Sequence, residues 1–223
     1  MIKPIYRWIL LYVFDPFILA PILAFVWSRI RGGFSRPHWM GRFVAVQVVD
    51  LVQGVIFIAL ALSHRNNQWF RHLSQPVVFA GTLWVLVRTS HPSPRRVGLY
   101  WACAGIGLLA AVAGVFVNGL FLRNALFTTT QCLIFIVLGI YELRGLALRD
   151  DDEDLAAKPE FWLNSAILIY GSTTLIFNAI SNHFLRVLPP HLLPLPWLVH
   201  GLVIVFYEIA LAKVFLCRKS ISS

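Results

Sequence analysis

Two carboxylic acids and two histidines stand inside long apolar stretches of the sequence, where an ionisable group is expensive and usually functional. Asp50 and Glu208 could carry a proton or a cation, or sense pH together with His72 and His200. The alternative is that both acids are protonated and hydrogen-bonded between helices. No Lys or Arg lies at the same depth, so the sequence predicts no cation beside either acid.

Amide, hydroxyl and imidazole groups line up with these ionisable residues at helical spacing. In one stretch the polar and small residues form a single stripe: Asn164, Gly171, Thr174, Asn178 and Ser181. Because polar groups in a bilayer must face a protein interior or a wet cavity, we expect such stripes to line a pocket. The residues predicted to bind a ligand in the outer half of that pocket are His72, Gln75, Gln131, Asn178, His200 and Tyr207.

The same residues argue against several kinds of chemistry. Each helix supplies one histidine, whereas zinc sites favour closely spaced ligands such as His-x-x-x-His, so we expect no metal and no cofactor. No G-x-S-x-G elbow appears, and we assign no catalytic residue. Lys213 is too near the end of its helix, and points away from Glu208, for a Schiff-base lysine. An intramembrane lipid hydrolase remains an alternative.

The elements that position these residues are apolar helices. The chain has 223 residues, of which 13% are charged, against about 25% in soluble domains. We therefore expect an all-α, polytopic membrane bundle. Seven apolar runs have the length that a bilayer requires: 6–28, 43–63, 69–88, 98–120, 125–146, 160–182 and 196–216.

The basic residues predict the orientation of these helices. Lys3, Arg7, Arg65, Arg71, Arg123 and Arg186 fall on one side, and the other thirteen of the 19 Lys and Arg residues fall on the opposite side. The positive-inside rule then places the N-terminus outside and the C-terminus in the cytoplasm. The net charge of +9 is thus explained by topology and lipid headgroups, and nucleic acid is not an expected partner. Three cysteines without loop pairs argue against disulfides.

Three sequence marks recur in order and suggest a duplication. The first and fifth helices end with Arg-Gly. The second and sixth begin with a basic residue followed by Pro and Trp. The third and seventh begin with Trp-x-x-His. We expect one domain, 1–223, with repeat halves 5–89 and 124–217 joined by the helix 98–120. Small residues four apart in that helix, such as Gly107 and Ala111, predict close packing inside the chain, or a homodimer through the same face.

Three segments resemble a known family: "NNQWFRH" (66–72), "KPEFWLNSAILIYGSTTLIF" (158–177) and "LPWLVHG" (195–201). The sequence is similar there to uncharacterised seven-helix membrane proteins widespread in Bacteroidetes-type bacteria. Gly171-Ser172 after Tyr170 departs from that pattern, in which an aromatic residue precedes the serine. The resemblance implies the bacterial cytoplasmic (inner) membrane and signalling beside a sensor histidine kinase. It supplies no catalytic residues.

Together these features favour a receptor-like sensory protein. It would bind a small molecule or lipid in the outer pocket and signal to a cytoplasmic partner through its loops, which include the acidic run 150–154. One alternative is a small transporter of 3+1+3 plan, coupled to a proton or cation through Asp50 or Glu208. Another is a structural subunit of a membrane complex.

Overall fold

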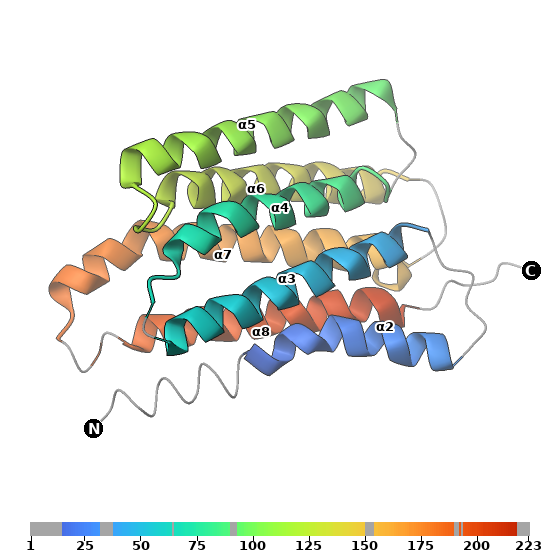
Figure 1. The fold of residues 1–223 in the computed structure, drawn as a ribbon. Helices are drawn as coiled ribbons and strands as arrows, with labels where there is room; N and C mark the ends of the chain where they lie inside the picture. The colour runs from blue at the N-terminus through green and yellow to red at the C-terminus, as the bar shows by residue number, and fades with distance from the viewer. Residues whose placement is uncertain are drawn as a thin grey trace, which may run out of the picture. The chain divides into compact units, whose positions relative to one another are not determined.

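A computed structural model describes residues 15–31, 38–63, 65–89, 93–149, 154–189, 192 and 194–217. In these ranges the chain forms seven α-helices and two short 3-10 helices, with no strand, which confirms the all-α prediction (Figure 1). The elements are η2 (Asp15–Leu19), α2 (Ala20–Ile30), α3 (Trp39–Leu62), α4 (Gln68–Leu86), α5 (Pro94–Asn118), α6 (Ala125–Ala147), η3 (Leu155–Ala157), α7 (Pro159–Val187) and α8 (Pro194–Leu216).

Four segments are long and apolar enough to cross a membrane: Trp39–Leu60, Pro94–Asn118, Ala125–Ala147 and Leu198–Leu216. The described part of the first predicted run gives only the shorter apolar helix Phe17–Ile30. The helices α4 and α7 coincide with the predicted runs 69–88 and 160–182, but they hold more polar side chains than the four membrane-crossing candidates. The structure thus supports a membrane protein, while seven crossings and the orientation stay predictions.

Contacts divide the chain into two compact units, which we call unit 1 (residues 1–35 and 132–223) and unit 2 (36–131). Unit 2 contains α3, α4, α5 and the first two turns of α6, and unit 1 contains the other described elements. This division differs from the predicted repeat halves, which break within the 89–124 region. The duplication therefore stays a prediction.

In unit 2, α3 and α4 run antiparallel at close range, and α4 also packs on α5 (Figure 1). The guanidinium of Arg42 lies 4.9 Å from the ring centre of Trp84. One turn after Arg42, Val46 of α3 faces Gly81 of α4. A Cβ built on Gly81 would stand 3.0 Å from Val46 Cγ2. A larger residue at 81 would push the two helices apart, so this glycine sets their separation.

The small residues of α5 form its packing face, as the sequence predicted. Cys103, Gly107, Ala110, Ala111 and Gly114 are buried. The phenyl ring of Phe79 on α4 fills the space where a Gly107 side chain would stand. This face is therefore occupied within the chain, which favours internal packing over the homodimer. The opposite face of α5 is exposed, for example at Trp101 (73%), as expected for contact with lipid tails.

A buried arginine closes the connection between α4 and α5. Arg96 donates from Nη2 to the carbonyl of Leu86, at 2.9 Å, and to Oγ1 of Thr89, at 3.4 Å. Its own backbone N–H donates to the side chain of Ser93, the N-cap of α5. Arg96 thus adds a charged donor to the Leu86 carbonyl at the C-terminus of α4, which also accepts from the backbone N–H and the hydroxyl of Thr89.

We expect Arg96→Ala to lower the free energy of unfolding by about 2 kcal/mol, since hydrogen bonds from a charged donor are lost in a buried place. The neighbouring Arg95 is exposed, and Arg95→Ala should change stability by less than about 0.5 kcal/mol. Unfolding of the purified protein in mixed detergent micelles measures both. Equal losses from the two variants would contradict the capping role of Arg96.

In unit 1, α8 packs on both α7 and α2. The rings of Phe25 on α2 and Phe215 on α8 meet edge to face, 5.5 Å apart. Glycines bring α6 and α7 together, because a Cβ on Gly139 would stand 3.0 Å from Leu168 Cβ and one on Gly171 3.1 Å from the carbonyl oxygen of Cys132. Unit 1 is thus held by small residues and aromatic pairs.

Candidate functional site

A polar face runs along α3, which is long and apolar enough to cross a membrane. Gln47, Asp50 and Gln53 follow one another at intervals of three residues, so their side chains leave adjacent sides of the helix. Gln47 is 4% exposed. The Oε1 atoms of Gln47 and Gln53 are both buried, and neither has a hydrogen-bond partner among the residues that the structure describes. The amide oxygens of Gln47 and Gln53 and the carboxylate of Asp50 therefore form a row of hydrogen-bond acceptors in an apolar helix. We call this row the acceptor face of α3.

Arg71 of α4 lies beside this face. Its guanidinium stands 4.4 Å from the ring centre of Phe57, which is two turns beyond Asp50 on the same side of α3. Arg71 is the positive charge that acts on the Asp50 carboxylate. The prediction that no cation accompanies Asp50 is therefore wrong for this acid. Arg71 lies in the first turn of α4, and its long side chain can reach inward along the helix. The position of a residue in the sequence does not show how deep its charged group lies.

His72 is held by two hydrogen bonds on the other side of α4. Its Nε2 lies 2.8 Å from the carbonyl of Leu122, and its Nδ1 lies 3.1 Å from Nδ2 of Asn124. The same Nδ2 donates to the carbonyl of Ala111, while Oδ1 of Asn124 accepts from the N–H of Phe127. These bonds fix the amide, so Nδ1 of His72 accepts, Nε2 donates and the imidazole is neutral.

The consequence is that both ring nitrogens of His72 are used by the chain itself, which leaves none for a ligand. Gln75, one turn further on, and Gln131, where unit 2 ends within α6, are half-buried. Their role in binding stays a prediction. Asn124 was missed in the sequence, although an asparagine directly before an apolar run is a helix N-cap signal.

In unit 1, His200 and Tyr207 take part in a seam between α7 and α8. The His200 ring stacks on Phe177, with centres 4.4 Å apart and planes within 9°. Seven residues along each helix, Tyr207 meets Tyr170 with centres 4.8 Å apart. Lys213 lies over Trp162 a further two turns on, 5.9 Å from the ring centre. We call these three pairs the α7–α8 ladder. It places two predicted ligand residues in a helix–helix contact.

Beside the ladder, polar groups are buried in unit 1. Glu208, next to Tyr207, is 2% exposed. Asn164, Gly171 and Thr174 are also buried, which confirms the inward stripe for these three residues. Asn178 is half-buried, and the side chain of Ser181 lies outside the described residues. Asn164 donates to the carbonyl of Glu160 at 2.8 Å, while its own Oδ1 is buried without a partner.

The predicted pocket is thus divided between the two units. Unit 2 holds Asp50, His72, Gln75 and Gln131, and unit 1 holds Asn178, His200, Tyr207 and Glu208. Within unit 2 the structure brings together Asp50, Arg71 and two glutamines. Of these four residues, only Asp50 was predicted as a site residue.

No metal-binding group of three or more His, Cys, Asp or Glu side chains occurs in the ranges that the structure describes. The three cysteines are free thiols. Cys217 follows the last apolar span, and burial raises the pKa of its thiol, an effect that Lys213 opposes and Glu160 reinforces. Its thiolate, the reactive form, is accordingly scarcer at neutral pH than that of a free cysteine.

Comparison of the chain with protein-family models, with curated proteins and with solved structures finds no match.

Proposed function

We propose that this chain is a receptor-like membrane protein that binds a small polar molecule at the acceptor face of α3 and signals to a cytoplasmic partner. The observation that supports this most is the pair of buried, unpartnered glutamine oxygens flanking Asp50 in a membrane-spanning helix. A buried polar group without a hydrogen bond is destabilising by about 1–3 kcal/mol. Such groups persist in membrane helices chiefly where they serve a function.

The chemistry of the face suggests what it would bind. Gln47 and Gln53 offer acceptor oxygens, Asp50 offers a carboxylate, and Arg71 offers donors at one end. A ligand with an ammonium or another hydrogen-bond donor would pair with the acceptors, and an acidic group on the same molecule would pair with Arg71. The predicted ligand residues Gln75 and Gln131 belong to the same unit.

The partner remains the one that the sequence suggested, a cytoplasmic signalling protein such as a histidine kinase. The ladder supports a route for the signal in unit 1, because paired rings couple α7 to α8 along their length. Of the acidic run, only Asp154 lies within the described residues, and its side chain accepts from the N–H of Ala156.

Accessibility from water tests the proposal. Cys103, Cys132 and Cys217 are first replaced with serine, and single cysteines are then introduced as Gln47→Cys and Gln53→Cys. Each variant is treated with a membrane-impermeant thiol reagent from one side of the membrane at a time. We expect Gln53→Cys to react from one side only, because a receptor pocket opens to one compartment.

Two controls make the result decisive. Val52 is exposed on the apolar side of the same helix, and Val52→Cys should stay unreactive because lipid excludes the charged reagent. Arg65 is exposed at the connection before α4, and Arg65→Cys should react from a single side. If neither glutamine position reacts while Arg65→Cys does, the face is dry and the receptor proposal gives way to a structural subunit.

Transport is the second candidate, and one observation favours it specifically. Pro76 lies inside α4, five residues after Arg71, and it removes the N–H that would bond to the carbonyl of His72. A weakened hydrogen-bond ladder in the helix that carries Arg71 suits a site that opens to either side. Reaction of Gln53→Cys from both sides would support this transporter and contradict the receptor.

A further inference from the structure

The charge of unit 2 is carried almost entirely by arginine. Its basic residues are Arg36, Arg42, Arg65, Arg71, Arg88, Arg95, Arg96 and Arg123, with no lysine, and Asp50 is its sole acid. Arginine differs from lysine in its planar fork of donors, which matches the oxygens of a phosphate. Unit 2 therefore has many guanidinium donors and a single carboxylate with which they could pair.

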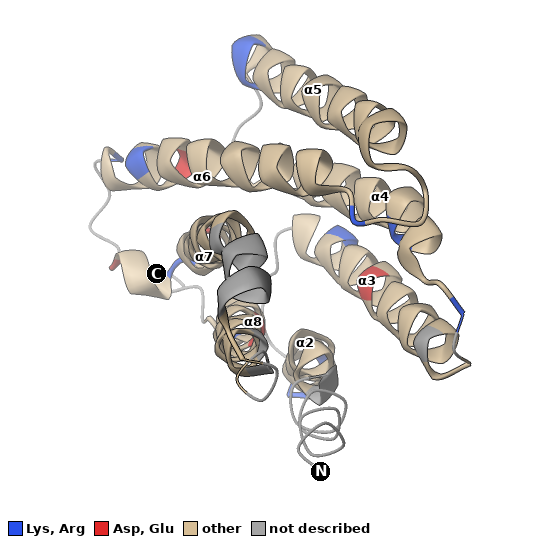
Figure 2. Cartoon of the chain, turned by 90° about the vertical axis from the view of Figure 1, so that its left-hand side faces the viewer, with Lys and Arg blue, Asp and Glu red and all other residues tan. Residues whose placement is uncertain are grey.

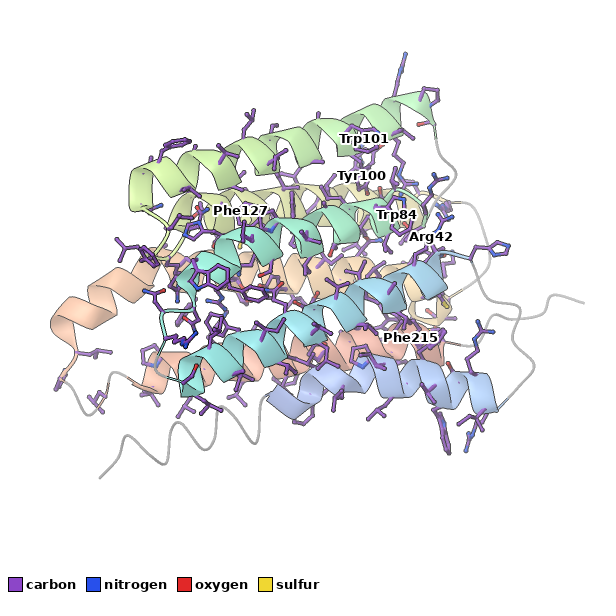
Figure 3. All side chains as sticks on the ribbon, in the orientation of Figure 1. Arg42, Trp84, Tyr100, Trp101, Phe127 and Phe215 are labelled. Atoms are coloured by element: carbon purple, nitrogen blue, oxygen red, sulfur yellow. The ribbon has the colours of Figure 1, made fainter. Side chains whose placement is uncertain are left out.

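Several of these arginines gather at one end of the unit. Arg42 lies in the first turns of α3, Arg88 directly follows α4, and Arg95 lies in the first turn of α5. Figure 3 shows Arg42 and Trp84 next to each other at this end, where Tyr100 and Trp101 of α5 also lie. In Figure 2 the blue positions of α5 likewise stand at one end of that helix.

The donors at this end differ in how far the chain already uses them. Arg96 is committed to Leu86 and Thr89. Arg42 rests on the face of Trp84, an arrangement that leaves the edge of the guanidinium and its N–H groups able to donate. Arg88 and Arg95 are exposed.

A further donor lies one turn before Arg42. Trp39 is only 4% exposed, and its buried indole N–H has no hydrogen-bond partner within the described ranges. Neither α3 nor α5 has an acidic residue in its first turn. The cluster of Trp39, Arg42, Trp84 and Arg88, which we call the donor cluster, therefore offers N–H groups and no carboxylate to receive them.

The surroundings of the donor cluster identify the source of the anion. Trp84 is 46% exposed, and exposed tryptophans at the ends of apolar helices mark the boundary between hydrocarbon and headgroups. Further along α3 and α4, Val52, Val77 and Leu73 are exposed as well, a surface for acyl chains. An oxyanion bound at this end, next to a surface that suits acyl chains, would be the phosphate of a lipid.

We propose that the donor cluster is a binding site for the headgroup of an anionic phospholipid, with Arg42 and Arg88 on the phosphate, the Trp39 indole N–H as a further donor and the Trp84 ring beneath Arg42. This goes beyond the proposed receptor site, which lies deeper along α3, and does not depend on it.

Lipid binding to the purified full chain tests the site. Phosphatidylglycerol and phosphatidylcholine, with the same acyl chains, are titrated separately into detergent micelles, and bound lipid is counted by native mass spectrometry. We expect phosphatidylglycerol to bind preferentially. Arg42→Gln and Arg88→Gln should each weaken its binding about fivefold, the effect of one basic residue near an anionic headgroup.

The control is Arg65→Gln, which removes an exposed arginine from the opposite end of α3 and should leave binding unchanged. Arg42→Lys keeps the charge but loses the fork, so it should bind less phosphatidylglycerol than the wild type and more than Arg42→Gln. If Arg42→Gln does not fold, Arg88→Gln carries the test, because its exposed side chain supports no helix contact.

Three results would overturn the proposal. Equal binding of the two lipids would show that the headgroup charge is not recognised. An equal loss in Arg65→Gln and Arg88→Gln would reduce the effect to general attraction. Inorganic phosphate that displaces phosphatidylglycerol at equal concentration would identify a soluble anion as the ligand.

Discussion

Gly114→Ala should lower the free energy of unfolding by about 3 kcal/mol, a large effect for a single methyl group. A Cβ at position 114 would collide with the side-chain amide of Asn124. That amide cannot move aside, because it bonds to Ala111, His72 and Phe127 at 3.0, 3.1 and 3.0 Å. The new methyl group must therefore break buried hydrogen bonds or separate α5 from α6. Unfolding in mixed detergent micelles measures the loss.

Gly105 supplies the matched control on the same helix, since a Cβ there meets nothing within 4 Å. Gly105→Ala should be neutral or stabilise α5 by up to about 1 kcal/mol, because alanine is the better helix former. The cause can be isolated by adding Gly114→Ala to Asn124→Ala, where the methyl group has room and its effect should largely vanish. Similar losses in both backgrounds would contradict the collision.

Asn124→Ala should itself destabilise the protein by about 3 kcal/mol. The side chain is the N-cap of α6, where Oδ1 accepts from Phe127, and removing such a cap is worth about 1 kcal/mol. Its Nδ2 also bonds to Ala111 and His72, and each buried bond adds about 1 kcal/mol. Thermal unfolding of the purified protein in mixed detergent micelles measures the loss.

Asn118 is the matched control, an asparagine at the last residue of α5. Asn118→Ala should change the midpoint of unfolding little, since no hydrogen bond holds that side chain in the described part of the chain. If Asn124→Ala and Asn118→Ala were equally mild, the His72–Asn124 pair would not be what joins α4 to the α5–α6 connection.

The helices were predictable because each is a long apolar run that ends at a clear signal. The run at 98–120 appears as Pro94–Asn118, where Ser93 caps the start and Gly119, with a φ of 76°, ends the helix. The run at 125–146 appears as Ala125–Ala147. These boundaries depend on local sequence, which a single chain displays. The count of membrane crossings depends also on how polar α4 and α7 are, and stays open to experiment.

The site was only partly predictable, because its pairings cross between helices. The apolar run of α3 identified Asp50, yet it could not show that Arg71 of α4 acts on this acid. Spacing along α4 selected His72 as a ligand, whereas Leu122 and Asn124 occupy its nitrogens. A polar residue on an inward face is visible in sequence, but its partner is a property of packing.

The α7–α8 ladder has a mechanical consequence. Its two ring pairs, Phe177–His200 and Tyr170–Tyr207, are seven residues apart on each helix, which is slightly fewer than the residues in two turns of a straight helix, so α7 and α8 should coil about each other with a left-handed twist. Stacked rings can tilt, but sliding one helix along the other would move the His200 ring off the Phe177 ring. Displacement along the axis is therefore blocked, and the two helices should pivot as one lever.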